Sequence, residues 1–188
     1  RWHDAGYKNL KMCVNLSARQ FQSEALSHTI EEALQQSGLP PQLLELELTE
    51  SILMEDPNAA IQLLRELARQ GICLAIDDFG TGYSSLSYLK LFPVNRLKID
   101  HSFVHDLTVD EDDAAIVDAV IAMAHSLKMS VIAEGVETKE QLDYLISRGC
   151  IDIQGFYFSQ PLLPARLDQC KFQFPGQADS SSGLRKSG

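Results

Sequence analysis

Hydrophobic and polar positions follow two alternating patterns along most of the chain. Short apolar runs typical of strands are separated by longer stretches in which apolar residues recur every three or four positions, from residue 11 to about residue 160. This order predicts repeated βα units around a parallel sheet, an α/β fold. We expect six strands, at residues 11–17, 43–51, 73–79, 96–100, 130–135 and 151–155.

The stretches between these strands carry helix boundary signals. Asp56 followed by Pro57 predicts an N-cap with proline in the first turn, and Thr138-x-x-Gln141 resembles a capping box. Gly38 and Gly71 are expected to end helices. We therefore expect helices at residues 23–37, 57–70, 84–90, 112–127 and 139–148. The runs at 74–76 and 131–133 are apolar on both sides, which favours a barrel or a doubly wound sheet.

Composition and charge limit the classes of protein to consider. A chain of 188 residues with 45% hydrophobic content can bury a core, and it holds no apolar run near the roughly 18 residues of a membrane span. A net charge of -10 disfavours binding to a nucleic acid polymer. Carboxylates that hold divalent cations can nevertheless bind a phosphodiester. We expect a domain over residues 1–175 and a disordered polar tail over 176–188.

The cysteines and histidines show no metal-binding spacing. The four cysteines are far apart and are predicted to be reduced thiols packed in the core of a cytoplasmic protein, rather than a disulfide or a zinc site. The five histidines share no spacing and are predicted to be surface or packing residues. These positions are Cys13, Cys73, Cys150, Cys170, His3, His28, His101, His105 and His125.

Polar side chains end nearly every expected strand. Because the carboxyl ends of parallel strands meet at one mouth of a barrel, these side chains are expected to lie together. A single acid after a strand is usually a helix N-cap, but repetition over successive strands favours a shared site. The residues, strand by strand, are Asn15 and Ser17, Glu47 and Glu50, Asp77 and Asp78, Lys98 and Asp100, Glu134 and Glu137, and Gln154.

The adjacent pair Asp77 and Asp78 is the strongest local candidate for metal binding. Oxygen ligands without a cysteine or a histidine pair favour Mg²⁺ or Mn²⁺ over Zn²⁺. A two-metal centre suits phosphodiester hydrolysis, in which Lys98 would orient a water or offset charge in the transition state. The following Gly80 and Gly82 permit a tight loop over the site, although the loop has no Gly-Lys-Ser/Thr and is not a P-loop.

Six blocks of the sequence resemble, in order, the EAL domain family of bacterial cyclic-di-GMP phosphodiesterases. They are VNLS with QF at residues 14–17 and 20–21, ELTES at 47–51, DDFGTGYSSL at 77–86, LKID at 97–100, AEGVET at 133–138 and QGFYFSQPL at 154–162. The resemblance covers about residues 11–163. It implies a TIM-like (β/α) barrel that hydrolyses cyclic di-GMP to linear pGpG with Mg²⁺ or Mn²⁺ in a two-metal site.

The resemblance also implies roles for individual residues. Asn15, Glu47 and Asp77 would bind one metal, and Asp77, Asp78 and Glu134 would hold or support the second. Lys98 would position the nucleophilic water, with Asp78 and Glu134 as its catalytic partners. Further active-site support would come from Glu137 and Gln154, and Glu50 would anchor the loop at 78–85. For single residues the plainer alternatives stay open: Glu50 as a helix cap, Glu137 as a first-turn acid and Ser17 as a turn former.

The Glu-Ala-Leu motif that names the family is expected on a strand before Asn15, and only fourteen residues precede Asn15 here. We therefore expect a barrel that is incomplete at its N-terminus. An upstream segment absent from this chain explains this better than a truncated natural protein, and we expect weak or no activity from the fragment alone. The letters EAL at residues 24–26 and 32–34 are predicted to lie in a helix, because their apolar residues follow helical spacing.

Three other functions stay open from the sequence. The main alternative is a catalytically inactive receptor for cyclic di-GMP; the others are an interaction scaffold and a barrel hydrolase of another phosphodiester. The retained polar residues favour an enzyme. The resemblance further implies upstream sensory or cyclase domains and leaves a homodimer open. It implies a cytoplasmic location, either free or as the cytoplasmic part of a membrane-anchored protein.

Overall fold

A computed structural model describes residues 10–82, 86–163 and 166. Its six strands are all parallel and form one sheet in the order β1 to β6, so each strand pairs with its neighbours along the chain. The predicted strands are confirmed, with β3 at its predicted bounds and the others shorter. Their bounds are Met12–Asn15 (β1), Leu44–Thr49 (β2), Cys73–Phe79 (β3), Arg96–Ile99 (β4), Ser130–Ala133 (β5) and Asp152–Ile153 (β6).

Helices separate the strands as predicted. The expected helices are α2 (Leu26–Ser37), α4 (Pro57–Arg69), α5 (Leu86–Leu89), α7 (Glu111–Ser126) and α8 (Lys139–Ser147). The first two residues expected in α5 lie outside the described part of the chain. Sequence patterns missed the short elements α1 (Ala18–Phe21), η1 (Pro41–Leu43), α3 (Glu50–Glu55) and α6 (His101–His105). Each is too short to show a helical hydrophobic period.

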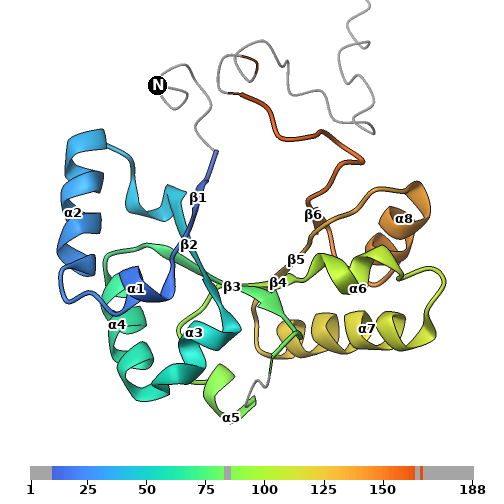
Figure 1. Ribbon diagram of the computed structural model, residues 1–188, viewed down its shortest axis with the longest axis horizontal. Coiled ribbons are helices and arrows are strands. Elements are labelled where there is room, and N and C mark those ends of the chain that lie inside the picture. The colour runs from blue at the N-terminus through green and yellow to red at the C-terminus, as the bar shows by residue number, and fades with distance from the viewer. Residues whose placement is uncertain (1–9, 83–85, 164–165, 167–188) are drawn as a thin grey trace, which may run out of the picture.

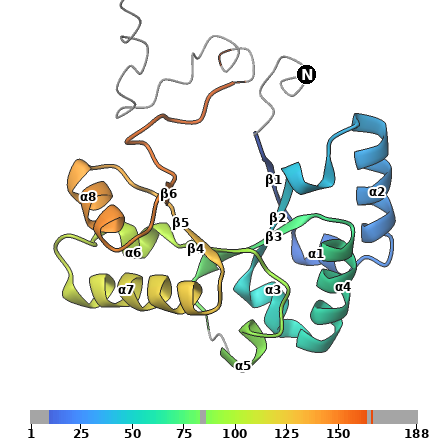
Figure 2. The ribbon, with the colours of Figure 1, turned by 180° about the vertical axis from the view of Figure 1, so that it is seen from behind.

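The sheet is strongly curved and open. In Figures 1 and 2 the strands trace an arc with β1 and β6 at its two ends, and helices α2, α4, α7 and α8 lie along its outer side. Within the described residues β1 pairs with β2 alone and β6 with β5 alone. The expectation of an incomplete TIM-like barrel is therefore confirmed.

The two faces of the sheet differ in chemistry. The convex face packs against the helices through buried side chains such as Leu46, Leu74, Leu97 and Val131, which form the core. Side chains alternate along each strand, so the intervening residues face the concave side, and many of these are charged. Ile132, on the concave side, is only half-buried, so the expected burial on both faces holds for β3 and not fully for β5.

Helix boundaries follow the predicted signals. The Asp56 side chain accepts a hydrogen bond from the Ala59 amide at 3.1 Å, and Thr138 and Gln141 form a reciprocal capping box. Gly38 ends α2 in a left-handed conformation. Ser17 caps α1 together with Gln20. The capping signals in the sequence therefore mark helix ends that the structure contains.

Two sequence predictions need correction. Glu24 and Ala25 lie in the turn before α2, where the Ser23 hydroxyl accepts a hydrogen bond from the Ala25 amide, so only the second EAL triplet lies inside a helix. Cys13 is exposed rather than packed in the core, because β1 is an end strand and its concave side is uncovered. Cys150 is buried as predicted.

Two further predictions concern membrane spans and the C-terminal tail. No helix of the described ranges is both long and apolar enough to cross a bilayer. The predicted tail at 176–188 and Cys170 lie outside the described residues.

Candidate metal and phosphodiester site

The two adjacent carboxylates of β3, Asp77 and Asp78, both lie near Glu134. Neighbouring side chains of a regular strand point to opposite faces, but the pairing of β3 with β4 shifts register between Ile76 and Phe79. Asp78 takes a left-handed conformation at φ 51°, which Asp tolerates better than most residues. As a result Asp77 and Asp78 each place an oxygen within 4.8 Å of an oxygen of Glu134.

Lys98 lies at the centre of these carboxylates. Its Nζ atom is 2.7 Å from Glu47 Oε2, 2.9 Å from Asp77 Oδ1 and 2.8 Å from Glu134 Oε1. Burial opposes the charged ammonium, but the hydrogen bonds to the three carboxylates outweigh it and raise the pKa of Lys98. We call Glu47, Asp77, Asp78, Lys98 and Glu134 the carboxyl-end cluster, because they lie at the carboxyl ends of the strands.

Asn15 extends this cluster from β1. With its amide nitrogen toward the carboxylates, it donates to Glu47 Oε2 and to Asp77 Oδ2, each at 3.2 Å. With the amide oxygen in that place, three oxygens would converge, and only a cation would stabilise them. Amide and carboxylate oxygens are the donors that Mg²⁺ and Mn²⁺ prefer, so the donor set fits a divalent metal of this kind.

Two carboxyl groups of the site are harder to ionise than usual. Burial raises the pKa of Asp78, and the adjacent Asp77 and Asp100 carboxylates add to the rise. Burial also raises the pKa of Glu134, more than the Lys98 ammonium lowers it. Loss of hydration is the main cause of both pKa shifts and the neighbouring carboxylates add to it; a divalent cation bound there would favour the ionised forms.

Glu50, the first residue of α3, contacts the loop after β3. Glu50 Oε2 accepts a hydrogen bond from the Gly80 amide at 3.4 Å, and its side chain is buried. Oε1 finds no hydrogen-bond partner among the described residues. A Cβ atom at Gly82 would lie 2.8 Å from Oε1, so any other residue there would displace the Glu50 carboxylate. This contact suits a loop anchor, and its first-turn position suits the plainer alternative; residues 83–85 lie outside the described part.

Glu137 follows β5 by four positions, and Gln154 comes directly after β6. Both are exposed, and neither side chain makes a hydrogen bond or ion pair with the described residues. The backbone of Gln154 bonds to Ala133 and Val136, which places it beside Glu134. The described histidines take no part in the cluster. Asp100, which the sequence placed among the strand-end residues without a role of its own, caps α6 and borders Asp78.

A second charged group lies one layer below, toward the amino ends of the strands, and the sequence analysis did not predict it. Arg96 Nη1 is 3.1 Å from Glu45 Oε1 and Nη2 is 3.0 Å from Asp152 Oδ2. Lys11 Nζ is 3.0 Å from Glu45 Oε2. We call Lys11, Glu45, Arg96 and Asp152 the amino-end cluster. By strand alternation each of these residues points inward, which is a signal in the sequence. The inward side was expected to be an apolar core, so the charged residues there were not interpreted as a cluster.

Cys13 lies between the two clusters. Its sulfur comes within 4.8 Å of oxygens of Glu45 and Glu47, a spacing that a metal could use. Loss of hydration, together with these carboxylates, raises the pKa of Cys13 to about 11. Since both oxygens of Glu45 already bind Lys11 and Arg96, ion pairing accounts for this group.

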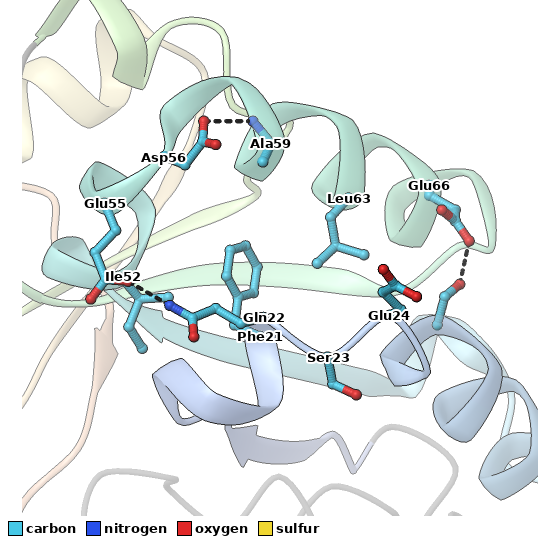
Figure 3. A pocket seen from close by; sticks show the side chains of 11 residues that line it. Phe21, Gln22, Ser23, Glu24, Ile52, Glu55, Asp56, Ala59, Leu63 and Glu66 are labelled. Carbon is cyan, nitrogen blue, oxygen red and sulfur yellow. Dashed lines mark hydrogen bonds between the residues drawn. The ribbon is translucent and has the colours of Figure 1, made fainter.

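A hollow of about 300 Å³ lies on the outer layer, between α1 and the start of α2 on one side and α3 and α4 on the other (Figure 3). Phe21, Ile52 and Leu63 line it together with acidic side chains. Three of those acids have partners within the layer: Glu55 accepts from Gln22, Asp56 caps α4 and Glu66 accepts from Ser27. No residue of the carboxyl-end cluster lines the hollow, so the two sites are separate.

Comparison with known proteins places this geometry in a family. The sequence matches the family described as EAL domain over residues 1–161. It is 49% identical over 176 residues to the signaling protein YkoW of Bacillus subtilis, covering 94% of this chain and 22% of YkoW. It is 45% identical to MucR of Pseudomonas aeruginosa, a bifunctional diguanylate cyclase and cyclic di-GMP phosphodiesterase, covering 86% of this chain and 24% of MucR. The chain thus spans about a quarter or less of these relatives.

Solved structures agree with the sequence match. The PaMucR phosphodiesterase in complex with c-di-GMP superposes with a TM-score of 0.86 at 44% identity, over 88% of this chain and 67% of that one. Klebsiella pneumoniae BlrP1, solved at pH 9.0 with manganese and c-di-GMP, gives 0.77 at 33% identity, over 84% and 41%. The chain thus shares its sequence pattern and its fold with these proteins, and it belongs to the EAL domain family.

Proposed function

We propose that this chain is the phosphodiesterase part of a protein that hydrolyses cyclic di-GMP to linear pGpG with Mg²⁺ or Mn²⁺. The observation that carries the proposal is the convergence of Asp77, Asp78 and Glu134 within 4.8 Å at the mouth of the sheet, around Lys98. The complexes of PaMucR with c-di-GMP and of BlrP1 with manganese and c-di-GMP support it by similarity. The name of MucR likewise supports an accompanying cyclase domain in the intact protein.

The site residues divide the work as follows. Asn15, Glu47 and Asp77 would hold one metal, and Asp77, Asp78 and Glu134 the second. When bound, the metals would polarise the phosphate oxygens and make a water more acidic. Lys98, whose ammonium the three carboxylates keep charged, would orient that water through its positive charge and offset charge that develops on the phosphate.

The residues around the cluster would bind and orient the substrate. Glu137 and Gln154, which are both exposed, would support the nucleotide through their polar side chains. Glu50 would fix the loop that begins at Gly80 and so limit access of bulk water to the site.

The test is turnover of cyclic di-GMP by the intact protein with Mg²⁺, with Mn²⁺ and with chelator, and with the product separated by chromatography. We expect metal-dependent pGpG from the wild type and a loss of at least about a hundredfold in Asp77→Ala, because metal catalysis contributes several kcal/mol. Asp112→Ala, an exposed acid in the first turn of α7, is the matched control and should keep full turnover. Binding of cyclic di-GMP without turnover under every metal condition would make the protein a receptor instead.

A further inference from the structure

The guanidinium of Arg96 ties four strands together beneath the carboxyl-end cluster. Arg96 begins β4, and its side chain donates to Glu45 of β2, to Ser130 Oγ of β5 at 3.1 Å and to Asp152 of β6. The three bonds use Nε, Nη1 and Nη2, so each nitrogen of the planar guanidinium donates once. Its side chain is only 17% exposed, and that of Glu45 only 2%.

Each strand held by Arg96 carries a site residue a short way further along. Two residues span about 6–7 Å of strand, so a residue two positions on lies one layer higher on the same face. Glu47 follows Glu45 by two positions, Lys98 follows Arg96 by two, and Gln154 follows Asp152 by two. Glu134 follows Ser130 by four. The anchoring points thus lie directly below the groups that they would place.

Strand β3 lies between β2 and β4, so the Arg96 side chain must cross over β3 to reach Glu45, and β3 leaves room for this crossing. Ala75 of β3 is the Cα partner of both Glu47 and Arg96, and it is fully buried. By alternation its methyl group lies on the same face as the Asp77 side chain. A small side chain there lets Arg96 and Lys98 reach over β3 to the glutamates of β2.

From this geometry we propose that Arg96 is a positioning residue for the metal site: it holds β2, β4, β5 and β6 in the register at which their carboxyl ends converge. The inference rests on the proposed function, since it assumes that the carboxyl-end cluster binds a divalent metal. Arg96 itself touches neither metal nor substrate in this role. It acts through Glu45, Ser130 and Asp152.

Charge and positioning make opposite predictions for a neutral substitution. Arg96 is a cation near a site for a dication, so its loss through charge alone would tighten metal binding. Loss of positioning would weaken it, because groups that orient metal ligands typically change affinity by about 10–100-fold. The sign of the change therefore separates the two effects.

The experiment measures Mn²⁺ affinity of the intact protein, by titration followed through the electron paramagnetic resonance of free Mn²⁺. We expect Arg96→Met to weaken Mn²⁺ binding by about 10–100-fold. Arg96→Lys keeps the charge but loses the fork, so it should recover part of the affinity. Arg148→Met is the matched control: Arg148 pairs with Asp118 on the outer helices, and its loss should leave Mn²⁺ affinity unchanged.

The Mn²⁺ affinities of the Arg96 variants separate the positioning role from the proposed function. Equal or tighter Mn²⁺ binding in Arg96→Met overturns the positioning role. If Arg96→Met does not fold, Arg96→Lys decides: weaker binding than wild type supports the role, and equal binding overturns it. A wild type that binds no Mn²⁺, or binds it without hydrolysing cyclic di-GMP, refutes the proposed function instead. A wild type that does both, beside an unaffected Arg96→Met, refutes this inference alone.

Discussion

The two charged clusters on the concave face are built alike and balanced differently. In each, a cation on β4 reaches a glutamate on β2: Arg96 binds Glu45 in the amino-end cluster, and Lys98 binds Glu47 in the carboxyl-end cluster. The amino-end cluster matches two cations with two carboxylates. The carboxyl-end cluster sets four carboxylates against the single ammonium of Lys98. The net charge is therefore zero in the amino-end cluster and strongly negative in the carboxyl-end cluster.

The balance of charge distinguishes a structural ion network from a group of residues that requires an added cation. A buried charge is costly unless it is paired, and the amino-end cluster satisfies that condition with its own residues. The carboxyl-end cluster does not, and the pKa values of Asp78 and Glu134 are raised, first by burial and then by the neighbouring carboxylates. Unbalanced charge that the fold nevertheless keeps together favours a ligand that supplies the missing positive charge.

The largest expected effect comes from removing the only cation of the carboxyl-end cluster. In chelator, Lys98→Met should lower the free energy of unfolding by about 3–5 kcal/mol, because it leaves buried carboxylates without a partner. Excess Mn²⁺ should restore much of the loss by binding the folded state, about 2.7 kcal/mol at a hundred times its dissociation constant. Urea unfolding with and without metal measures both. Lys139→Met, in an exposed pair with Asp143, is the control that should change little. Wild-type stability of Lys98→Met in chelator would contradict the comparison.

A paired substitution on β2 should separate the two clusters. Glu45→Gln should lower the free energy of unfolding by about 3 kcal/mol, because it unbalances a neutral buried network. Glu47→Gln removes repulsion, so in chelator its stability should stay within about 1 kcal/mol of wild type, while Mn²⁺ affinity falls about 10–100-fold. Urea unfolding and Mn²⁺ titration of both variants give the four values. The same pattern in both variants would mean that the clusters do not differ in role.

Filling the space at Ala75 tests the crossing that both clusters share. Ala75→Leu should cost about 1–3 kcal/mol of stability by overpacking and should also weaken Mn²⁺ binding, since Arg96 and Lys98 must then be displaced. Ala60→Leu is the matched control, because Ala60 is equally buried but lies in α4, away from both clusters. It should lose stability without losing Mn²⁺ affinity. Equal Mn²⁺ affinities in the two variants would argue against the crossing.

The smallest effect is expected at the edge of the amino-end cluster. Asp152 pairs with Arg96, but its side chain is 43% exposed, so water can replace the lost partner. Asp152→Asn should therefore change the free energy of unfolding by less than about 1 kcal/mol, as for exposed ion pairs. Thermal or urea unfolding checks this. A loss as large as that in Glu45→Gln would show that the network is cooperative out to its exposed end.

The sequence predicted the strands and the carboxyl-end cluster because both leave local signals. Apolar runs set the strands, and β3 kept its predicted bounds; polar residues just after those runs pointed to the mouth of the barrel. The short helices α3 and α6 were missed because each follows a strand directly and was read as its end or as a loop. One turn of helix carries too little periodicity to be told from an extended segment.

The amino-end cluster could not be predicted because it depends on contacts between residues far apart in the chain. Glu45 and Arg96 are separated by 51 positions, and each looks like an ordinary polar residue at the start of a strand. The exposure of Cys13 has a similar cause: an apolar neighbourhood predicts burial, but only the sheet order reveals that β1 is an end strand. The register shift after Ile76, which brings Asp78 beside Asp77, likewise has no local signal.

The left-handed backbone at Asp78 restricts which mutations evolution can accept there. Apart from glycine, Asn and Asp are among the few residues that adopt this conformation at low cost. Of the three, only Asp brings a carboxylate, and Asn keeps nearly its shape without the charge. A lineage that exchanged hydrolysis for mere recognition of the nucleotide would therefore find at this position a single step that preserves the fold.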